Sequence, residues 1–303
     1  MSSAGRTDTV VEGRRLSLSH LDKVLFPETG FTKGQLIEYY VRIAPLLLPH
    51  LRDRPLTLHR YPDGVEGQSF FEKHVPSHAP SWVRTVEVPS TSGRGGKGDV
   101  EYAMVCDLPA LVWAANLGSI ELHVPLWHVG RRRLLPAPPD HMVFDLDPGP
   151  GTTTVECCRV ARWIADLLAD DGLKAYPKTS GSKGLQLYVL LPGRPTWDRV
   201  HQRAHDLAQQ VEGAHPDAVV SSMRKTARHH KVLIDWSQNS PSKTTVAAYS
   251  VRACPEPTVS TPVTWDEVAA CAASGAPEDL RFTTEDVLER VEWRGDLMAP
   301  LGL

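Results

Sequence analysis

Residues 141–149 read HMVFDLDPG, and this short stretch does most to decide the fold. An apolar run, Met142 to Phe144, leads into Asp145 and Asp147, and a Pro-Gly pair follows. A buried strand that ends in a turn has this pattern. Side chains two positions apart on a strand share a face of the sheet. The sequence therefore predicts two carboxylates side by side at the end of a central strand.

Paired carboxylates of this kind point to a metal site. They repel each other unless a cation lies between them, and Mg²⁺ and Mn²⁺ share such oxygen ligands with substrate phosphates. A strand-end turn whose aspartates cap the next helix is the structural alternative. The D-x-D pattern after an apolar strand also occurs in haloacid-dehalogenase phosphatases and in metal-dependent glycosyltransferases, and by itself it does not choose among these enzymes.

The sequence around this strand alternates between helical and extended patterns. Helical spacing covers 151–172 and 196–213, a Thr264…Glu267 capping box opens a late helix, and strands are predicted at 173–180, 185–191 and 231–236. Before the strand, helical spacing dominates 16–54, and 55–130 read as short strands and turns. Such alternation indicates an α/β or α+β fold with a sheet at its centre.

A second motif, KTSGSKG at 178–184, follows two predicted elements later. Gly181 and Gly184 allow tight curvature, so that backbone N–H groups can converge on an anion. Ser180 and Ser182 offer hydroxyls, and Lys183 supplies a point charge suited to phosphate. The spacing is not that of a Walker loop. A plain hairpin turn remains the alternative.

Three more residues are candidates with weaker signals of their own. Asp235 ends the apolar segment KVLID at 231–235, and a third strand-end carboxylate is what a two-metal site needs. Arg252 closes the segment AAYSVR at 247–252. His123 lies between apolar residues in IELHVPLW, where a histidine more often belongs to the core than to a site.

Composition and terminal patterns exclude several classes of protein. The 303 residues carry a formal charge of −3 and five cysteines without a C-x-x-C pair, so a disulfide scaffold or a cysteine-rich zinc site is not expected. No apolar run is long enough to span a membrane, and the polar start lacks a secretory signal. We expect 1–15 to be flexible, 16–303 to form a single domain, 90–99 to be a glycine-rich turn and 131–140 to be an internal connection.

Taken together, these motifs resemble a known family. FDLDPG (144–149), TSGSKG (179–184), VLIDWSQNSPSKTT (232–245) and AYSVR (248–252) occur in the order and spacing of the polymerase domain of bacterial ligase D, in the archaeo-eukaryotic primase superfamily. The segments 21–51, 54–76 and 120–127 are also similar to that family, so the resemblance spans about residues 16 to 295. With no ligase or nuclease module beside it, the chain looks like a stand-alone version.

The resemblance implies a fold and an activity. The fold is a primase-polymerase core that resembles an RNA-recognition fold, packed with an N-terminal αβ portion. The activity is metal-dependent nucleotidyl transfer with two Mn²⁺ or Mg²⁺ ions, which extends or fills DNA ends and gaps in non-homologous end joining and prefers ribonucleotides. The implied partners are 5′-phosphorylated DNA, nucleoside triphosphates, Ku and a separate DNA ligase, in the nucleoid region of the cytoplasm and not at a membrane.

The resemblance also implies roles for individual positions. The catalytic set comprises the metal ligands Asp145, Asp147 and Asp235, together with His123. The nucleotide-binding set comprises Ser180, Lys183, Gly184, Gln186, Arg228, Gln238 and Arg252. The DNA-binding set comprises Lys23 and Lys33, which correspond to lysines that hold a 5′-phosphate, and Phe70 and Phe71, which correspond to a pair that stacks on template DNA.

Three positions depart from the family pattern. Gln186 stands where the family commonly has His, His59 where a basic residue, often Lys, is common, and His20 where Asn often occurs. Gln cannot carry charge, so nucleotide affinity or rate is expected to be lower. Two other hypotheses stay open: a D-x-D phosphatase-type hydrolase, whose motif would usually open the domain, and a non-catalytic DNA-end-binding module, which would be expected to lack an intact acid triad.

Overall fold

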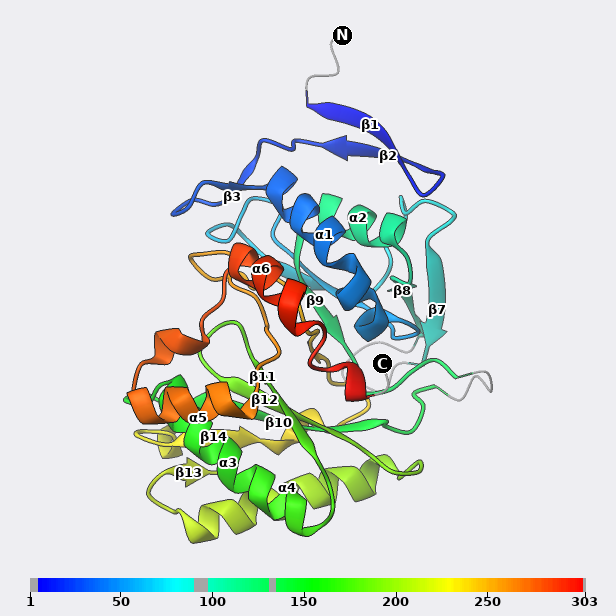
Figure 1. Cartoon of the computed structure of the whole chain (residues 1–303). Helices are drawn as coiled ribbons and strands as arrows, with labels where there is room; N and C mark the ends of the chain where they lie inside the picture. The colour runs from blue at the N-terminus through cyan, green and yellow to red at the C-terminus, as the bar shows by residue number, and fades with distance from the viewer. Residues whose placement is uncertain (1–4, 90–97, 131–134, 302–303) are drawn as a thin grey trace.

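Two main sheets with their helices, together with three two-stranded sheets, make up the structure, a computed structural model that describes residues 5–89, 98–130 and 135–301 (Figure 1). The sheet of the first lobe has the strand order β15-β9-β5-β6, and the sheet of the second has the order β11-β12-β10-β14-β13. Mixed helices and sheets of this kind confirm the α+β class.

The second lobe contains the predicted central strand. Its elements are β10 (His141–Pro148), α3 (Thr154–Asp170), β11 (Ala175–Thr179), β12 (Leu185–Leu190), α4 (Trp197–Ala214), β13 (Val219–Val220), β14 (Val232–Asp235) and α5 (Trp265–Ser274). An RNA-recognition-like core is expected to have the order strand-helix-strand-strand-helix-strand. This lobe has that order in β10, α3, β11, β12, α4 and β14, and its neighbouring strands β14, β10, β12 and β11 are all antiparallel.

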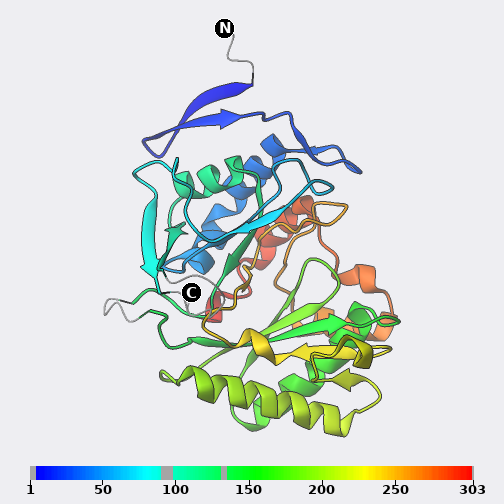
Figure 2. The same ribbon diagram turned by 180° about the vertical axis from the view of Figure 1, so that it is seen from behind.

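The two faces of β10 contact different parts of the protein. Met142, Phe144 and Leu146 are fully buried against the apolar faces of α3 and α4. On the opposite face Val143 packs into the core of the first lobe, and Asp145 and Asp147 follow it along the strand. The strand therefore presents its acids toward the first lobe, where Figures 1 and 2 show the two halves stacked on each other.

The first lobe is built mainly from the N-terminal half. Its elements are β1 (Arg6–Val11), β2 (Arg14–Ser19), β3 (Val24–Phe26), β4 (Phe31–Thr32), α1 (Lys33–Leu51), β5 (Thr57–Arg60), β6 (Phe70–Glu72), β7 (Arg84–Val88), β8 (Val100–Met104), α2 (Leu108–Asn116) and β9 (Ser119–Val124). The chain returns to this lobe through β15 (Thr245–Val246), which pairs with β9, and α6 (Thr284–Arg294), which packs on α1. The expected αβ portion is thus completed by C-terminal residues.

Capping residues set the helix ends that the sequence suggested. Thr264 and Glu267 form the predicted capping box of α5, and Thr153 with Glu156 forms another at the start of α3. Thr32 and Gln35 cap α1 in the same way. The expected helical region at 16–54 is wrong outside α1, because the chain before Thr32 forms strands and turns.

The N-terminal residues include regular secondary structure. Within the segment expected to be flexible, β1 and the start of β2 form an antiparallel hairpin. Its turn is Glu12-Gly13, and both residues have positive φ, the backbone of a tight hairpin turn that glycine favours. Residues 90–97 of the expected glycine-rich turn and 131–134 of the expected connection lie outside the described residues, and β7 and β8 flank the first of them.

Candidate active site

The three aspartates lie together on one face of the second sheet. Asp145 is the register partner of Asp235 across β10 and β14, and Asp147 lies two residues beyond Asp145 on the same strand. Strand alternation therefore places all three carboxylates on the same side. Asp145 and Asp235 are half-buried and Asp147 is exposed, so the cluster opens to solvent at Asp147.

Burial and mutual repulsion destabilise the ionised form of these carboxylates. Burial, followed by the charge of Asp147, raises the pKa of Asp145 to about 7. The pKa of Asp147 is also raised, by burial and then by the charge of Asp235. A bound cation relieves both effects, and oxygen-only ligands suit Mg²⁺ or Mn²⁺. The residues present thus fit the predicted metal centre, with one ligand exposed toward a substrate.

Neighbouring side chains fix the orientation of the two half-buried acids. The Gln186 side-chain amide donates to Asp145 Oδ1 at 3.1 Å. Asp235 accepts from the backbone N–H of Ser237 at 2.9 Å, from the Ser237 hydroxyl at 2.6 Å and from the Gln238 amide at 2.9 Å. Two predicted nucleotide-binding residues, Gln186 and Gln238, therefore contact the acids directly.

One polar row crosses four strands of this sheet. Lys178, Gln186, Asp145 and Asp235 are successive register partners on β11, β12, β10 and β14. Burial lowers the pKa of Lys178 well below its usual value, and its ammonium nitrogen lies 2.5 Å from Ser260 Oγ. Lys178 begins the KTSGSKG motif but was not predicted as a site residue. The signal available was its alternation with Tyr176, two residues earlier on the same strand.

The KTSGSKG motif forms a tight turn between β11 and β12. Ser180 Oγ accepts from the N–H groups of Ser182 at 3.2 Å and Gly184 at 3.0 Å. Gly181 has φ +72°, and a Cβ on Gly184 would lie 2.1 Å from the Leu146 carbonyl oxygen, so the turn packs directly on β10. Ser180 thus shapes the turn, whereas Lys183 is exposed.

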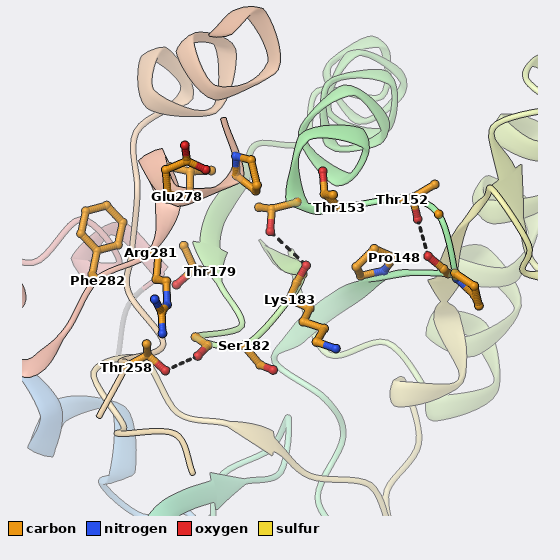
Figure 3. Close-up of a pocket in the computed structure, with 18 residues that line it drawn as sticks. Pro148, Thr152, Thr153, Thr179, Ser182, Lys183, Thr258, Glu278, Arg281 and Phe282 are labelled. Carbon is orange, nitrogen blue, oxygen red and sulfur yellow. Dashed lines mark hydrogen bonds between the residues drawn. The ribbon is translucent and has the colours of Figure 1, made fainter. Parts of the chain in front are cut away.

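A pocket of about 710 Å³ opens beside this turn. Figure 3 shows Lys183 and Ser182 on one side, the α3 N-terminus with Thr153 on another, and Arg281 and Phe282 opposite. The Thr154 hydroxyl donates to the Lys183 carbonyl at 3.0 Å and ties the helix to the turn. Among the described residues that line the pocket there is none of the three aspartates, so the turn separates the pocket from the acid cluster.

Two arginines flank the acids. Arg228 and Arg252 both favour the ionised form of Asp147 and so oppose the rise of its pKa. Arg252 donates from Nε to Glu121 Oε1 at 3.0 Å and from a terminal nitrogen to the Ser180 carbonyl at 2.6 Å. Arg252 therefore connects the turn to the first lobe, and Arg228 donates to the Met223 carbonyl at 2.9 Å.

His123 reaches the site through a partner that sequence analysis missed. Its Nε2 lies 2.8 Å from Glu121 Oε2, and the same oxygen lies 3.0 Å from Nδ1 of His59. Glu121 is buried, and hydrogen bonds from His123 and His59, with the charge of Arg252, keep its pKa well below the usual value despite that burial. Its position two residues before His123 on a predicted strand was the available signal.

The predicted DNA-binding lysines lie together away from the acids. The Lys33 backbone N–H donates to the Lys23 carbonyl at 2.8 Å, at the start of α1. The Lys33 ammonium donates to the backbone carbonyl of Ser19 at 2.6 Å, whereas Lys23 pairs with Asp63 at 2.7 Å. Burial, then the charges of Lys23 and Arg60, lowers the pKa of Lys33 to about 8.

Phe70 and Phe71 project from β6 and are exposed, 42% and 58% respectively. The Phe71 ring stacks on His59, with 3.8 Å between ring centroids and 15° between planes. Arg60 lies over the Phe70 ring at 5.2 Å. Exposed rings held flat by their neighbours provide a surface on which a base can stack.

Comparison with known proteins agrees with this geometry. The model of the family "LigD, primase-polymerase domain" matches residues 32–298. The multifunctional non-homologous end joining protein LigD of Mycolicibacterium smegmatis is 42% identical over 95% of this chain, and the bifunctional LigD of Bacillus subtilis is 31% identical over 93%. The chain spans only 36% and 43% of the length of these two relatives.

A solved structure is also similar. The polymerase domain from Mycobacterium tuberculosis ligase D in complex with DNA has a TM-score of 0.86 and 40% sequence identity, over 95% of this chain and 98% of that one. Within the described part of the chain, no helix is both long and apolar enough to cross a membrane.

Proposed function

The chain belongs to the LigD primase-polymerase domain family, whose members are nucleotidyltransferases of the archaeo-eukaryotic primase type, and from this premise we propose that it extends or fills DNA ends and gaps during non-homologous end joining. The observation that carries the proposal is the placement of Asp145, Asp147 and Asp235 on one sheet face. An acid triad that is intact and open to solvent favours an enzyme over a non-catalytic end-binding module.

We assign the metal-binding role to these three aspartates. Two Mn²⁺ or Mg²⁺ ions held there would lower the pKa of a primer hydroxyl and neutralise charge on the triphosphate. Gln186 holds the Asp145 carboxylate, and Ser237 and Gln238 hold that of Asp235. These contacts pre-orient the ligands, so little reorganisation accompanies ion binding.

The nucleotide-binding role falls to the turn and the cations around it. Lys183 is exposed, in the turn that packs on β10. Arg228 and Arg252 lie close enough to Asp147 to affect its pKa. Ser180 and Gly184 act by shaping the turn, because the Ser180 hydroxyl already accepts two backbone N–H groups. His123 is hydrogen-bonded to Glu121, and Arg252 connects Glu121 to the Ser180 carbonyl in the turn.

DNA is the proposed partner, as in the complex of the similar M. tuberculosis domain. Lys23 and Lys33 would hold the 5′-phosphate at the far side of a gap, and Phe70 with Phe71 would stack on template bases. A preference for ribonucleotides, cooperation with Ku and with a separate ligase, and action at the nucleoid in the cytoplasm belong to the same proposal.

A primer-extension assay tests the proposal. The chain is incubated with a gapped, 5′-phosphorylated DNA, a labelled ribonucleoside or deoxyribonucleoside triphosphate, and Mn²⁺ or Mg²⁺. Template-dependent addition to the primer, faster with the ribonucleotide, is the expected result. Phosphate release from a generic monoester without extension would instead support the hydrolase hypothesis, and DNA binding without either reaction would support the end-binding module.

A further inference from the structure

Three potential metal ligands lie together on one face of the first sheet, apart from the aspartates. His59 on β5 is the register partner of Glu121 on β9, and His123 lies two residues beyond Glu121 on the same strand. One donor atom from each residue lies within 4.8 Å of the other two. All three side chains are largely buried, with exposures of 13%, 6% and 12% for His59, Glu121 and His123. We call these residues the His59 cluster.

The two carboxylate oxygens of Glu121 have different hydrogen-bond partners. Its Oε1 accepts from the Arg252 Nε and from the Ala253 backbone N–H, each at 3.0 Å. Its Oε2 lies between the two imidazoles, 3.0 Å from His59 Nδ1 and 2.8 Å from His123 Nε2. One oxygen is therefore anchored by the protein and the other is shared by two nitrogens. A carboxylate that binds a metal through one oxygen, with its second oxygen hydrogen-bonded, has this arrangement.

The spacing matches a tetrahedral ion. With metal-ligand bonds of about 2.0–2.1 Å, ligand atoms lie about 3.3 Å apart, so the two contacts of Glu121 Oε2, at 2.8 and 3.0 Å, would each lengthen by about half an ångström or less. The other ring nitrogen of His59 lies 3.2 Å from Ser69 Oγ, a partner that can fix its tautomer.

We propose that His59, Glu121 and His123 form a binding site for one divalent transition-metal ion of the zinc class, separate from the three aspartates. Two histidines and one carboxylate leave a fourth position open, as in zinc sites with three protein ligands. The ligand chemistry separates the two sites, because imidazole favours Zn²⁺ or Co²⁺ whereas the all-oxygen aspartate cluster favours Mg²⁺ or Mn²⁺. The proposal does not depend on nucleotidyl transfer.

Co²⁺ is the appropriate probe, since a four-coordinate site with nitrogen ligands gives strong visible absorption and an octahedral oxygen site gives little. The whole chain, freed of metal with a chelator, is titrated with Co²⁺ and then with Zn²⁺. We expect one strongly absorbing Co²⁺ ion per chain, displaced by one Zn²⁺. His59→Lys, which can still pair with Glu121, and Glu121→Gln are each expected to weaken Zn²⁺ binding at least tenfold.

Two matched variants separate this site from the rest of the chain. Asp145→Asn/Asp147→Asn removes acids from the other cluster, and His78→Ala removes an exposed histidine. Both are expected to keep the Co²⁺ spectrum, and circular dichroism checks that every variant is folded. Unchanged Zn²⁺ affinity in folded His59→Lys, or loss of the spectrum in Asp145→Asn/Asp147→Asn, would overturn the proposal. Primer extension is measured separately, so failure of one proposal is distinguishable from failure of the other.

Discussion

Asp145 lies directly opposite Asp235 in the antiparallel register of β10 and β14, although 89 intervening residues separate them along the chain. No lysine or arginine forms an ion pair with either residue in the described part of the structure. Burial, then the charge of Asp147 and to a smaller extent that of Asp235, raises the pKa of Asp145 to about 7. A site that accepts this repulsion in its metal-free form is prepared for a divalent cation.

Replacing either aspartate of β10 should remove catalysis. Asp145→Ala and Asp147→Ala are expected to abolish primer extension, because each removes an oxygen from the proposed metal centre. DNA affinity should remain largely intact, since Lys23, Lys33 and Phe71 lie in the other lobe. Gel-based extension and fluorescence anisotropy measure the two quantities. Normal extension by either variant would refute the two-metal assignment.

Lys183 offers a test of the turn as a phosphate cradle. Lys183→Ala is expected to raise the nucleotide KM, because a charge-assisted contact to phosphate contributes roughly 1.5–3 kcal/mol, about tenfold to a hundredfold. Lys174→Ala is the matched control, because that exposed lysine precedes β11 at the end opposite the turn. Equal KM values for Lys183→Ala and wild type would show that the turn does not bind the triphosphate.

Gln186 is expected to tolerate histidine. Its Oε1 is buried and has no hydrogen-bond partner among the described residues, whereas its amide donates to Asp145. An imidazole can keep the donor and add positive charge near the substrate, so Gln186→His should extend primers at an equal or higher rate. Steady-state kinetics check this expectation. A large loss of kcat would mean that the surrounding site has adapted to Gln186.

The sequence predicts those features of the fold that depend on local patterns. Apolar periodicity gives β10, α3 and α4, and two-residue alternation places Asp145 and Asp147 on one face. The Glu12-Gly13 hairpin was missed because its polar strands carry little hydrophobic signal, although glycine marks the turn.

Contacts that depend on strand register could not be predicted from the sequence. His59 pairs with Glu121 only because β5 lies beside β9, and the register shifts between His59 and Arg60. Lys178 and Asp235 join the same polar row through three separate strand pairings. No local spacing encodes such pairings, so the contacts that Glu121 and Lys178 make across strands became visible only in the folded chain.

The stacked pair of Phe71 and His59 provides a test of template binding. Phe71→Ala is expected to weaken binding of a single-stranded template by about 1–3 kcal/mol, the contribution of one stacked base. Trp293→Ala is the control, since Trp293 on α6 is the more exposed aromatic, at 69%. Anisotropy with a labelled oligonucleotide measures both. The same loss in the two variants would point to a general surface effect and not to a stacking site.

The lysine pair should recognise a terminal phosphate. The Lys33 ammonium donates to the carbonyl of Ser19 and, at 3.2 Å, to the Ser19 hydroxyl, which leaves one of its three N–H groups for a phosphate. The ion pair between Lys23 and Asp63 is exposed and therefore weak enough to rearrange. Gapped DNA with a 5′-phosphate is expected to bind a few-fold more tightly than the 5′-hydroxyl form, on the order of 1 kcal/mol. Lys23→Ala/Lys33→Ala should abolish this preference, which should also shrink as salt is raised.

The preference should also depend on pH, because burial lowers the pKa of Lys33 to about 8. Below that pH Lys33 is charged and attracts the phosphate, and above it the neutral amine no longer does. A terminal phosphate is close to doubly charged throughout, since its second pKa is about 6. Raising the pH from about 7 to about 9.5 should therefore remove most of the preference, with a midpoint at or above pH 8 because bound phosphate favours the ammonium. The Lys33→Arg variant stays charged, so its preference for the 5′-phosphate should be the same at both ends of this pH range.

Two outcomes would contradict this assignment. Equal affinity for the two DNAs at low salt and pH 7 would show that the chain has no phosphate pocket. A pH-independent preference in wild type would assign the pocket to Lys23 alone.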